Sequence, residues 1–154
     1  MTRLPTLHQV LRDELQLQTR HCKILEAQQA ALLACDRAQF FALHDEYDVL
    51  LGQLEAQQDV RKMVLRQEDG SPLTLTLLLE MLPETVCRRL QPVRESLRRT
   101  LERVHALNRQ NQQMIQNELN YIAFSLELCM EAGRKNDSGY GGGGGGRLLL
   151  DRSA

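Results

Sequence analysis

The sequence has few aromatic side chains and no tryptophan. Three tyrosines and three phenylalanines are spread over 154 residues. This is poor material for a β-sandwich and for stacking single-stranded bases. The formal net charge of −1 gives the whole chain no attraction for nucleic acid or an anionic membrane surface. The composition therefore predicts no nucleic-acid partner.

Long apolar runs and a secretion signal are also missing. No apolar run approaches the roughly 20 residues that span a bilayer, so we expect no membrane insertion. The N-terminal residues are followed by charges and glutamines rather than by an apolar segment. We therefore expect no signal peptide.

Motifs for metal binding and catalysis are absent as well. The four cysteines (Cys22, Cys35, Cys87 and Cys129) form no C-x-x-C pair, which predicts reduced thiols rather than a zinc site. There is no P-loop, G-x-S-x-G or H-E-x-x-H motif, and no pair of Glu-x-x-His motifs for a di-iron bundle site. The acidic cluster around His44 is interpreted as a solvated helix face. The sequence thus predicts no enzyme, no catalytic or metal-ligating residues and no cofactor.

Residues that favour helices dominate the composition, and the apolar residues recur at the three- and four-residue spacing of a helix. A first helix is expected from about residue 7 to 35, after a capping box at Thr6. A second helix is expected from an N-cap at Asp36 to about Gln67, followed by a loop over 68–72.

The rest of the chain predicts one or two short helices over 73–91 and a long last helix from Val93 to Glu131. Gly133 is expected to end that helix, and the glycine-rich remainder is expected to be disordered. The predicted fold is all-α: an antiparallel bundle of three long helices (1–133) with a short helical insertion after the second. A flexible Gly-rich tail (134–154) follows.

Two asparagines interrupt the apolar stripe of the last helix. Asn108 and Asn111 fall in phase with the leucines and isoleucines on either side. A buried amide needs hydrogen-bond partners. One interpretation is a polar layer that fixes helix register. The other is that these amides face a partner helix, and the spacing alone does not separate the two.

A run of arginines from Arg88 to Arg109 is the one basic stretch. Glutamates lie among them, and no aromatic residues are interleaved. We interpret it as a solvated face with ion pairs between residues four apart. An acidic protein partner and attraction to the acidic segment 36–69 are the alternatives.

The order of these features resembles the FlgN family of flagellar export chaperones. The resemblance covers nearly the whole chain. It includes FFALHDEYDVLLGQLEAQQDVRKMVL in the second helix, LNRQN (107–111) followed by MIQNELNYI, and a tail with Tyr140-Gly141 and LLLDRSA. The uniform run of six glycines and the apolar insertion near 73–83 depart from the family pattern.

This resemblance implies a cytoplasmic chaperone with no catalysis. Its clients would be the C-terminal helical segments of the hook-filament junction proteins FlgK and FlgL. Its second partner would be the cytosolic domain of the export-gate protein FlhA, docked through Tyr140 and Gly141. A long helix with an apolar stripe suits helix-in-groove recognition. The expected client-binding residues are Leu107, Asn108, Asn111, Met114, Ile115, Leu119, Ile122 and Leu126. The alternative function is a structural coiled coil that self-associates. A chaperone of this kind is also compatible with a weak homodimer.

Overall fold

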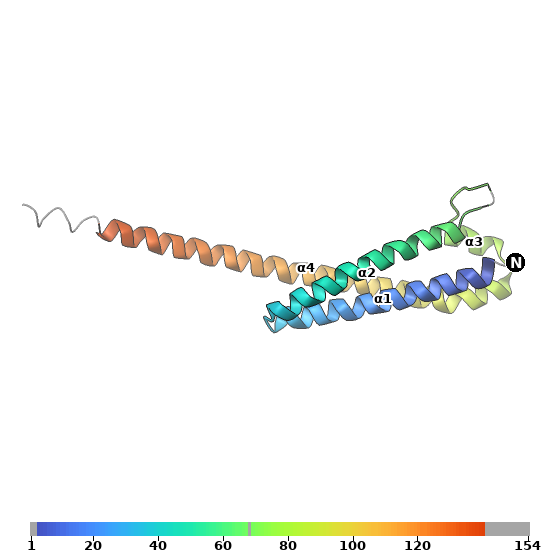
Figure 1. The fold of residues 1–154 in the computed structure, drawn as a ribbon, viewed down its shortest axis with the longest axis horizontal. Coiled ribbons are helices and arrows are strands. Elements are labelled where there is room, and N and C mark those ends of the chain that lie inside the picture. Colours follow the sequence, from blue (N-terminus) through green and yellow to red (C-terminus); the bar gives the residue numbers. More distant parts are fainter. Residues whose placement is uncertain (1–2, 68, 141–154) are drawn as a thin grey trace, which may run out of the picture. The chain divides into compact units, whose positions relative to one another are not determined.

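The structure, a computed structural model, describes residues 3–67 and 69–140, with side chains described for 6–67 and 69–137. These residues form four α-helices: α1 (Arg3–Leu33), α2 (Arg37–Val64), α3 (Leu75–Met81) and α4 (Glu84–Tyr140) (Figure 1). Within them the only β pairing is one isolated antiparallel bridge between Arg66 and Pro72. The all-α prediction is confirmed.

The chain divides into two compact units. The first, residues 1–112, contains α1, α2, α3 and the first part of α4. The second begins at Gln113, and its described part is the remainder of α4.

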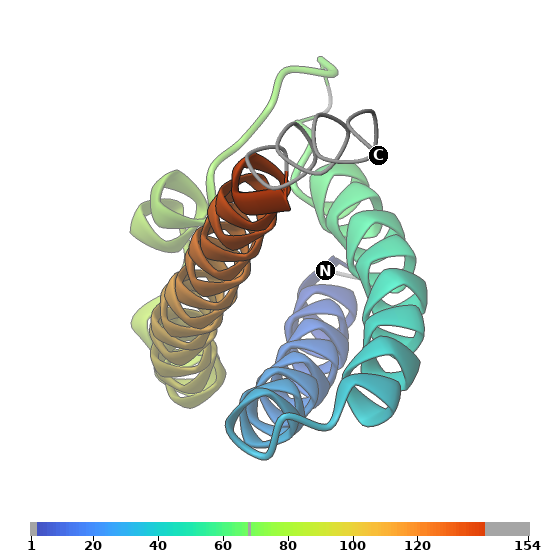
Figure 2. The same cartoon turned by 90° about the vertical axis from the view of Figure 1, so that its left-hand side faces the viewer.

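Helices α1 and α2 form an antiparallel hairpin joined by a tight turn (Figure 2). Cys35 adopts a left-handed conformation (φ 54°). The Cys35 amide donates to the Leu32 carbonyl and the Asp36 amide to the Ala31 carbonyl, the bonds of a Schellman motif. The Asp36 carboxylate then accepts from the Gln39 amide at 3.0 Å. The predicted N-cap at Asp36 is thus confirmed.

Helix α1 packs against both other long helices of the first unit. Ile24 lies in one cluster with Leu50 and Leu54 of α2. Leu25 lies in another with Val104 and Leu107 of α4. At the other end of α1, a third cluster joins α1, the end of α2 and α4, with α3 packed against it. Its buried members are Leu7, Leu11, Leu65, Leu90 and Leu97. The apolar insertion therefore covers one end of this unit.

The buried face of α1 also carries polar side chains. Glu14 is buried, and both of its carboxylate oxygens accept from Nη1 of Arg61 on α2, at 2.9 and 3.0 Å. Loss of hydration raises the pKa of Glu14, and the Arg61 charge opposes that rise. An acid in this helix–helix interface is thus matched by a guanidinium from the facing helix.

His21 is a second buried polar group of α1. Its ring lies 5.2 Å from the Tyr47 ring, and Nδ1 is 3.3 Å from Oε1 of Gln18. Nε2 is buried and has no hydrogen-bond partner in the described part of the chain. Burial lowers the pKa of His21, and the charge of His105 lowers it further. Burial in the folded unit therefore favours the neutral form of this imidazole.

Three predicted helix boundaries are wrong. Helix α1 begins at Arg3, before the predicted capping box, because Pro5 is compatible with a first helical turn. Helix α4 begins at Glu84 and contains Pro92. Pro92 lies on an exposed face, where water can satisfy the carbonyl that loses its donor.

The third wrong boundary is the predicted end at Gly133, since α4 continues to Tyr140. A glycine inside a helix costs only about 1 kcal/mol, and here helix formers flank it on both sides. The predicted disorder does not apply to residues 134–140. The remainder of the predicted tail, from Gly141, lies outside the described residues.

Candidate interaction surfaces

In the first unit, helix α4 buries side chains at a seven-residue spacing, together with Leu107. The residues seven apart are Leu90, Leu97, Val104 and Asn111. The amide nitrogen of Asn111 donates to the Leu25 carbonyl of α1 at 2.9 Å. Its Oδ1 is also buried and has no partner among the described residues. Asn111 is therefore part of the interface between α1 and α4.

Two neighbouring candidate residues, Leu107 and Asn108, also lie in this unit. Leu107 is buried against Leu25 and Val104, and Asn108 is half-buried. Of the predicted client-binding residues, Leu107 and Asn111 thus lie in the core of the first unit. Five of the eight predicted residues lie beyond residue 112: Met114, Ile115, Leu119, Ile122 and Leu126.

The described part of the second unit has no buried side chain from 113 to 137. Met114 and Ile115 are half-buried, and Leu119, Ile122 and Leu126 are exposed. The exposed large apolar residues of this segment are Leu119, Tyr121, Ile122, Phe124, Leu126, Leu128 and Met130. An apolar helix face of this extent is typical of a partner-binding surface.

This surface, which we call the α4 apolar face, consists of two lines of side chains. Residues of a helix are 100° apart. On that geometry Ile115, Leu119, Ile122 and Leu126 form one line. Met114, Tyr121 and Leu128, seven residues apart, form the other. The sequence-based prediction missed Tyr121 and Leu128, although their spacing from Met114 was a signal for them.

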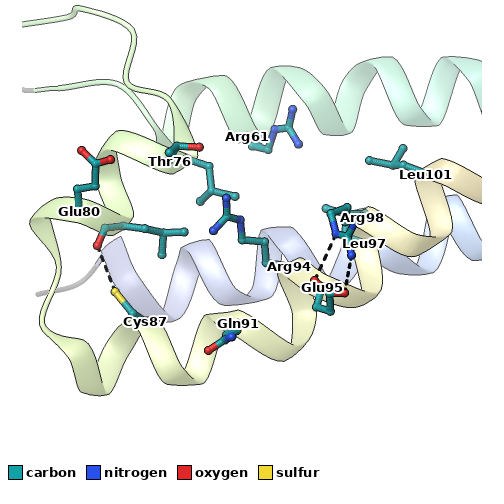
Figure 3. A pocket seen from close by; sticks show the side chains of 12 residues that line it. Arg61, Thr76, Glu80, Cys87, Gln91, Arg94, Glu95, Leu97, Arg98 and Leu101 are labelled. Carbon is teal, nitrogen blue, oxygen red and sulfur yellow. Dashed lines mark hydrogen bonds and ion pairs between the residues drawn. The ribbon is translucent and has the colours of Figure 1, made fainter.

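A separate groove lies in the first unit, between α3, α4 and the end of α2 (Figure 3). Its volume is about 840 Å³, and Leu75, Leu79, Leu97 and Leu101 supply much of its apolar lining. The thiol of Cys87 donates to the Leu79 carbonyl across it, at 3.2 Å. The groove is open, and its apolar walls belong to the packing of α3 onto α4.

Among the described residues, four of the seven arginines from Arg88 to Arg109 are paired with glutamates. Arg98 bonds Glu95 and Glu102 at 2.7 and 2.8 Å, and Arg99 bonds Glu95 at 3.1 Å. Arg103 pairs with Glu26 of α1 at 2.5 Å. These pairs confirm the interpretation as a solvated, ion-paired face. Across the described residues, no ion pair joins this stretch to α2.

The two predicted gate-docking residues lie at the end of the described chain. Tyr140 is the last residue of α4, and Gly141 lies outside the described residues. In the described chain, no three His, Cys, Asp or Glu side chains gather to hold a metal ion. None of the helices over 3–67 and 69–140 has a window apolar enough to span a bilayer.

A packed helical unit followed by a helix with an uncovered apolar face is typical of the class of helical proteins that bind partners. Comparison with family models gives the particular family: the model described as "FlgN protein" matches residues 1–147. The chain therefore belongs to the FlgN family, which consists of flagellar export chaperones rather than enzymes. No match was found among curated proteins, and none among solved structures.

Proposed function

We propose that this cytoplasmic chaperone binds the C-terminal helical segments of the hook-filament junction proteins on its α4 apolar face. Binding there would keep these subunits from assembling early and allow their delivery to the type III export gate. The observation that carries the proposal is the exposure of five large apolar side chains of this face on a segment with no buried residue: Leu119, Tyr121, Ile122, Leu126 and Leu128.

The chemistry of this face fits an amphipathic helix as client. Ile115, Leu119, Ile122 and Leu126 supply anchors at the three- and four-residue spacing that helix-in-groove recognition uses, and Met114 lies on the second line of the face. No described side chain of 113–137 is buried, so a client covers apolar area that water otherwise contacts. In this proposal Leu107 and Asn111 stabilise the first unit and do not contact the client. Asn108 lies at the edge of that unit.

Export-gate docking is assigned to Tyr140 and Gly141, toward the cytosolic domain of FlhA. The support for this is the family resemblance together with the position of Tyr140 at the end of α4, 14 residues after Leu126. Separate client and gate sites would let the chaperone hold a client while it docks. Tyr140→Ala should therefore leave client affinity unchanged and weaken binding to the FlhA cytosolic domain.

The test is a calorimetric titration of the full chain with the C-terminal segment of each junction protein from the same organism. We expect saturable one-to-one binding at micromolar affinity or tighter. Ile122→Asp should weaken it at least about tenfold, because it places a charge on an apolar contact.

Asn120→Asp is the matched control. It adds the same charge two residues earlier, about 160° away around the helix. It should bind like the wild type, and circular dichroism should show equal helicity in both variants. The proposal would be contradicted if neither junction-protein segment bound, or if Ile122→Asp bound as tightly as the wild type.

Self-association through the α4 apolar face is the second candidate, because the same exposed side chains could cover each other in two copies. Light scattering distinguishes the two functions. A stable oligomer that does not dissociate on addition of a junction-protein segment would favour the structural coiled coil.

A further inference from the structure

One acidic residue lies in the middle of the α4 apolar face. Glu118 is the only acid between Glu102 and Glu127. The residues three and four positions away in both directions are Met114, Ile115, Tyr121 and Ile122, all apolar. Since residues at these spacings are neighbours on a helix surface, Glu118 is surrounded by apolar side chains.

Glu118 is exposed and lacks the partners that nearby polar residues have. Gln113 bonds Asn117 at 3.1 Å, and Gln116 bonds Asn120 at 3.0 Å. Within the described residues, no hydrogen bond or ion pair is found for Glu118. Its carboxylate is hydrated only as long as nothing covers the face.

A partner helix on this face removes that hydration. Desolvating an unpaired carboxylate is costly, whereas a facing cation with good geometry offsets the cost. The first unit of this chain contains such a case. Glu14 lies in the interface between α1 and α2, and Arg61 of the facing helix bonds both of its oxygens.

A second copy of the chain is a poor occupant for the same reason. In a parallel, in-register pairing, Glu118 of one copy would face Glu118 of the other. Like charges at facing core positions of a helix pair disfavour that pairing. The acid thus acts against self-association while leaving the apolar lines on both sides available.

We propose that Glu118 selects the partner of the α4 apolar face. The favoured partner is a helix whose apolar stripe carries a lysine or arginine opposite Glu118, and a second copy of this chain is disfavoured. This inference rests on the proposed function, because it specifies the chemistry of the client helix.

The first test uses three synthetic amphipathic helical peptides as probes, identical except for Lys, Leu or Glu at the centre of the apolar stripe. Each is titrated calorimetrically into the full wild-type chain and into Glu118→Lys. We expect the wild type to bind the Lys peptide about tenfold more tightly than the Glu peptide, because the pair changes from attraction to repulsion. Glu118→Lys should reverse the preference.

Glu127→Lys is the matched control. It makes the same charge change nine residues later, about 180° around the helix from Glu118. It should keep the wild-type preference for the Lys peptide. Equal affinities for the three peptides, or a reversal by Glu127→Lys as well, would overturn the inference.

Light scattering of the free chain gives a second, independent readout. Glu118→Leu should shift the chain toward a dimer at concentrations where the wild type is a monomer. A wild type that dimerises as strongly as Glu118→Leu would contradict the selection against a second copy.

Titration with the junction-protein segments separates the two proposals. Binding of those segments without any preference among the three peptides would overturn only the role of Glu118. Failure of both the segments and the peptides to bind would overturn the proposed function and this inference together.

Discussion

The two parts of helix α4 have similar apolar spacing but differ in what covers them. In the first unit Leu90, Leu97, Val104 and Leu107 are buried against α1 and its neighbours. From 113 to 137 no described side chain is buried. The same periodicity thus contributes to a core in one part and leaves an exposed face in the other. Apolar spacing identifies a face, whereas the fold decides whether this chain or a partner covers it.

The largest expected difference between the two parts of α4 is in the stability cost of the same substitution, leucine to alanine. Leu97→Ala removes a buried side chain and should cost about 2–5 kcal/mol of unfolding free energy, from lost burial and the cavity left behind. Leu119→Ala removes an exposed one and should change stability by less than about 0.5 kcal/mol. Denaturant titrations of both variants and the wild type measure the difference. Equal losses of stability would mean that residues beyond 112 are packed in solution.

A pH titration should separate the two parts further. The folded first unit disfavours protonation of His21, whereas the unfolded chain binds the proton below about pH 6.5. Stability contributed by His21 is therefore present above that pH and decreases as the pH falls toward the lowered folded pKa. Melting temperatures of the wild type should drop over this range.

The variant His21→Leu isolates the histidine in that experiment. Leucine has a similar volume, cannot titrate and removes the unpartnered Nε2, so the drop should be smaller than in the wild type. Glu14, whose pKa is raised, acts in the opposite direction and is common to both proteins. Identical pH profiles of the two proteins would mean that the fold does not lower the pKa of His21.

The smallest expected effect concerns the second part of α4 alone. Gly133 lies in the helix, and a Cβ built there meets no atom within 4 Å. Gly133→Ala should stabilise this part of the helix locally by about 0.5–1 kcal/mol. Circular dichroism should show a small gain in helicity, while the melting midpoint of the first unit stays unchanged. A loss of helicity would contradict a continuous helix through residue 133.

Much of the fold could be predicted from the sequence, because its signals are local. The all-α class follows from composition and helical spacing, and the Asp36 cap follows from one side chain and its position. Helix ends were harder to predict. Pro92 and Gly133 are both weak helix residues, yet neither ends α4, because packing and neighbouring residues outweigh their cost.

The apolar face could be anticipated in part, whereas its role in client binding stays a prediction. Ile115, Leu119 and Ile122 lie on an uncovered face, and their spacing placed them on one stripe. The same spacing also selected Leu107 and Asn111, which α1 covers. Which stretch of a stripe is covered depends on the partner helix and where it ends, so it could not be read from the stripe itself.

Hydrogen exchange of the full chain, with and without a junction-protein segment, tests the central claim most directly. We predict that amides of 113–137 exchange faster than those of 90–111 in the free chain, because packing stabilises only the latter. Adding the segment should protect 113–137 and leave 90–111 nearly unchanged. Protection confined to the first unit, or none at all, would contradict a client site on the α4 apolar face.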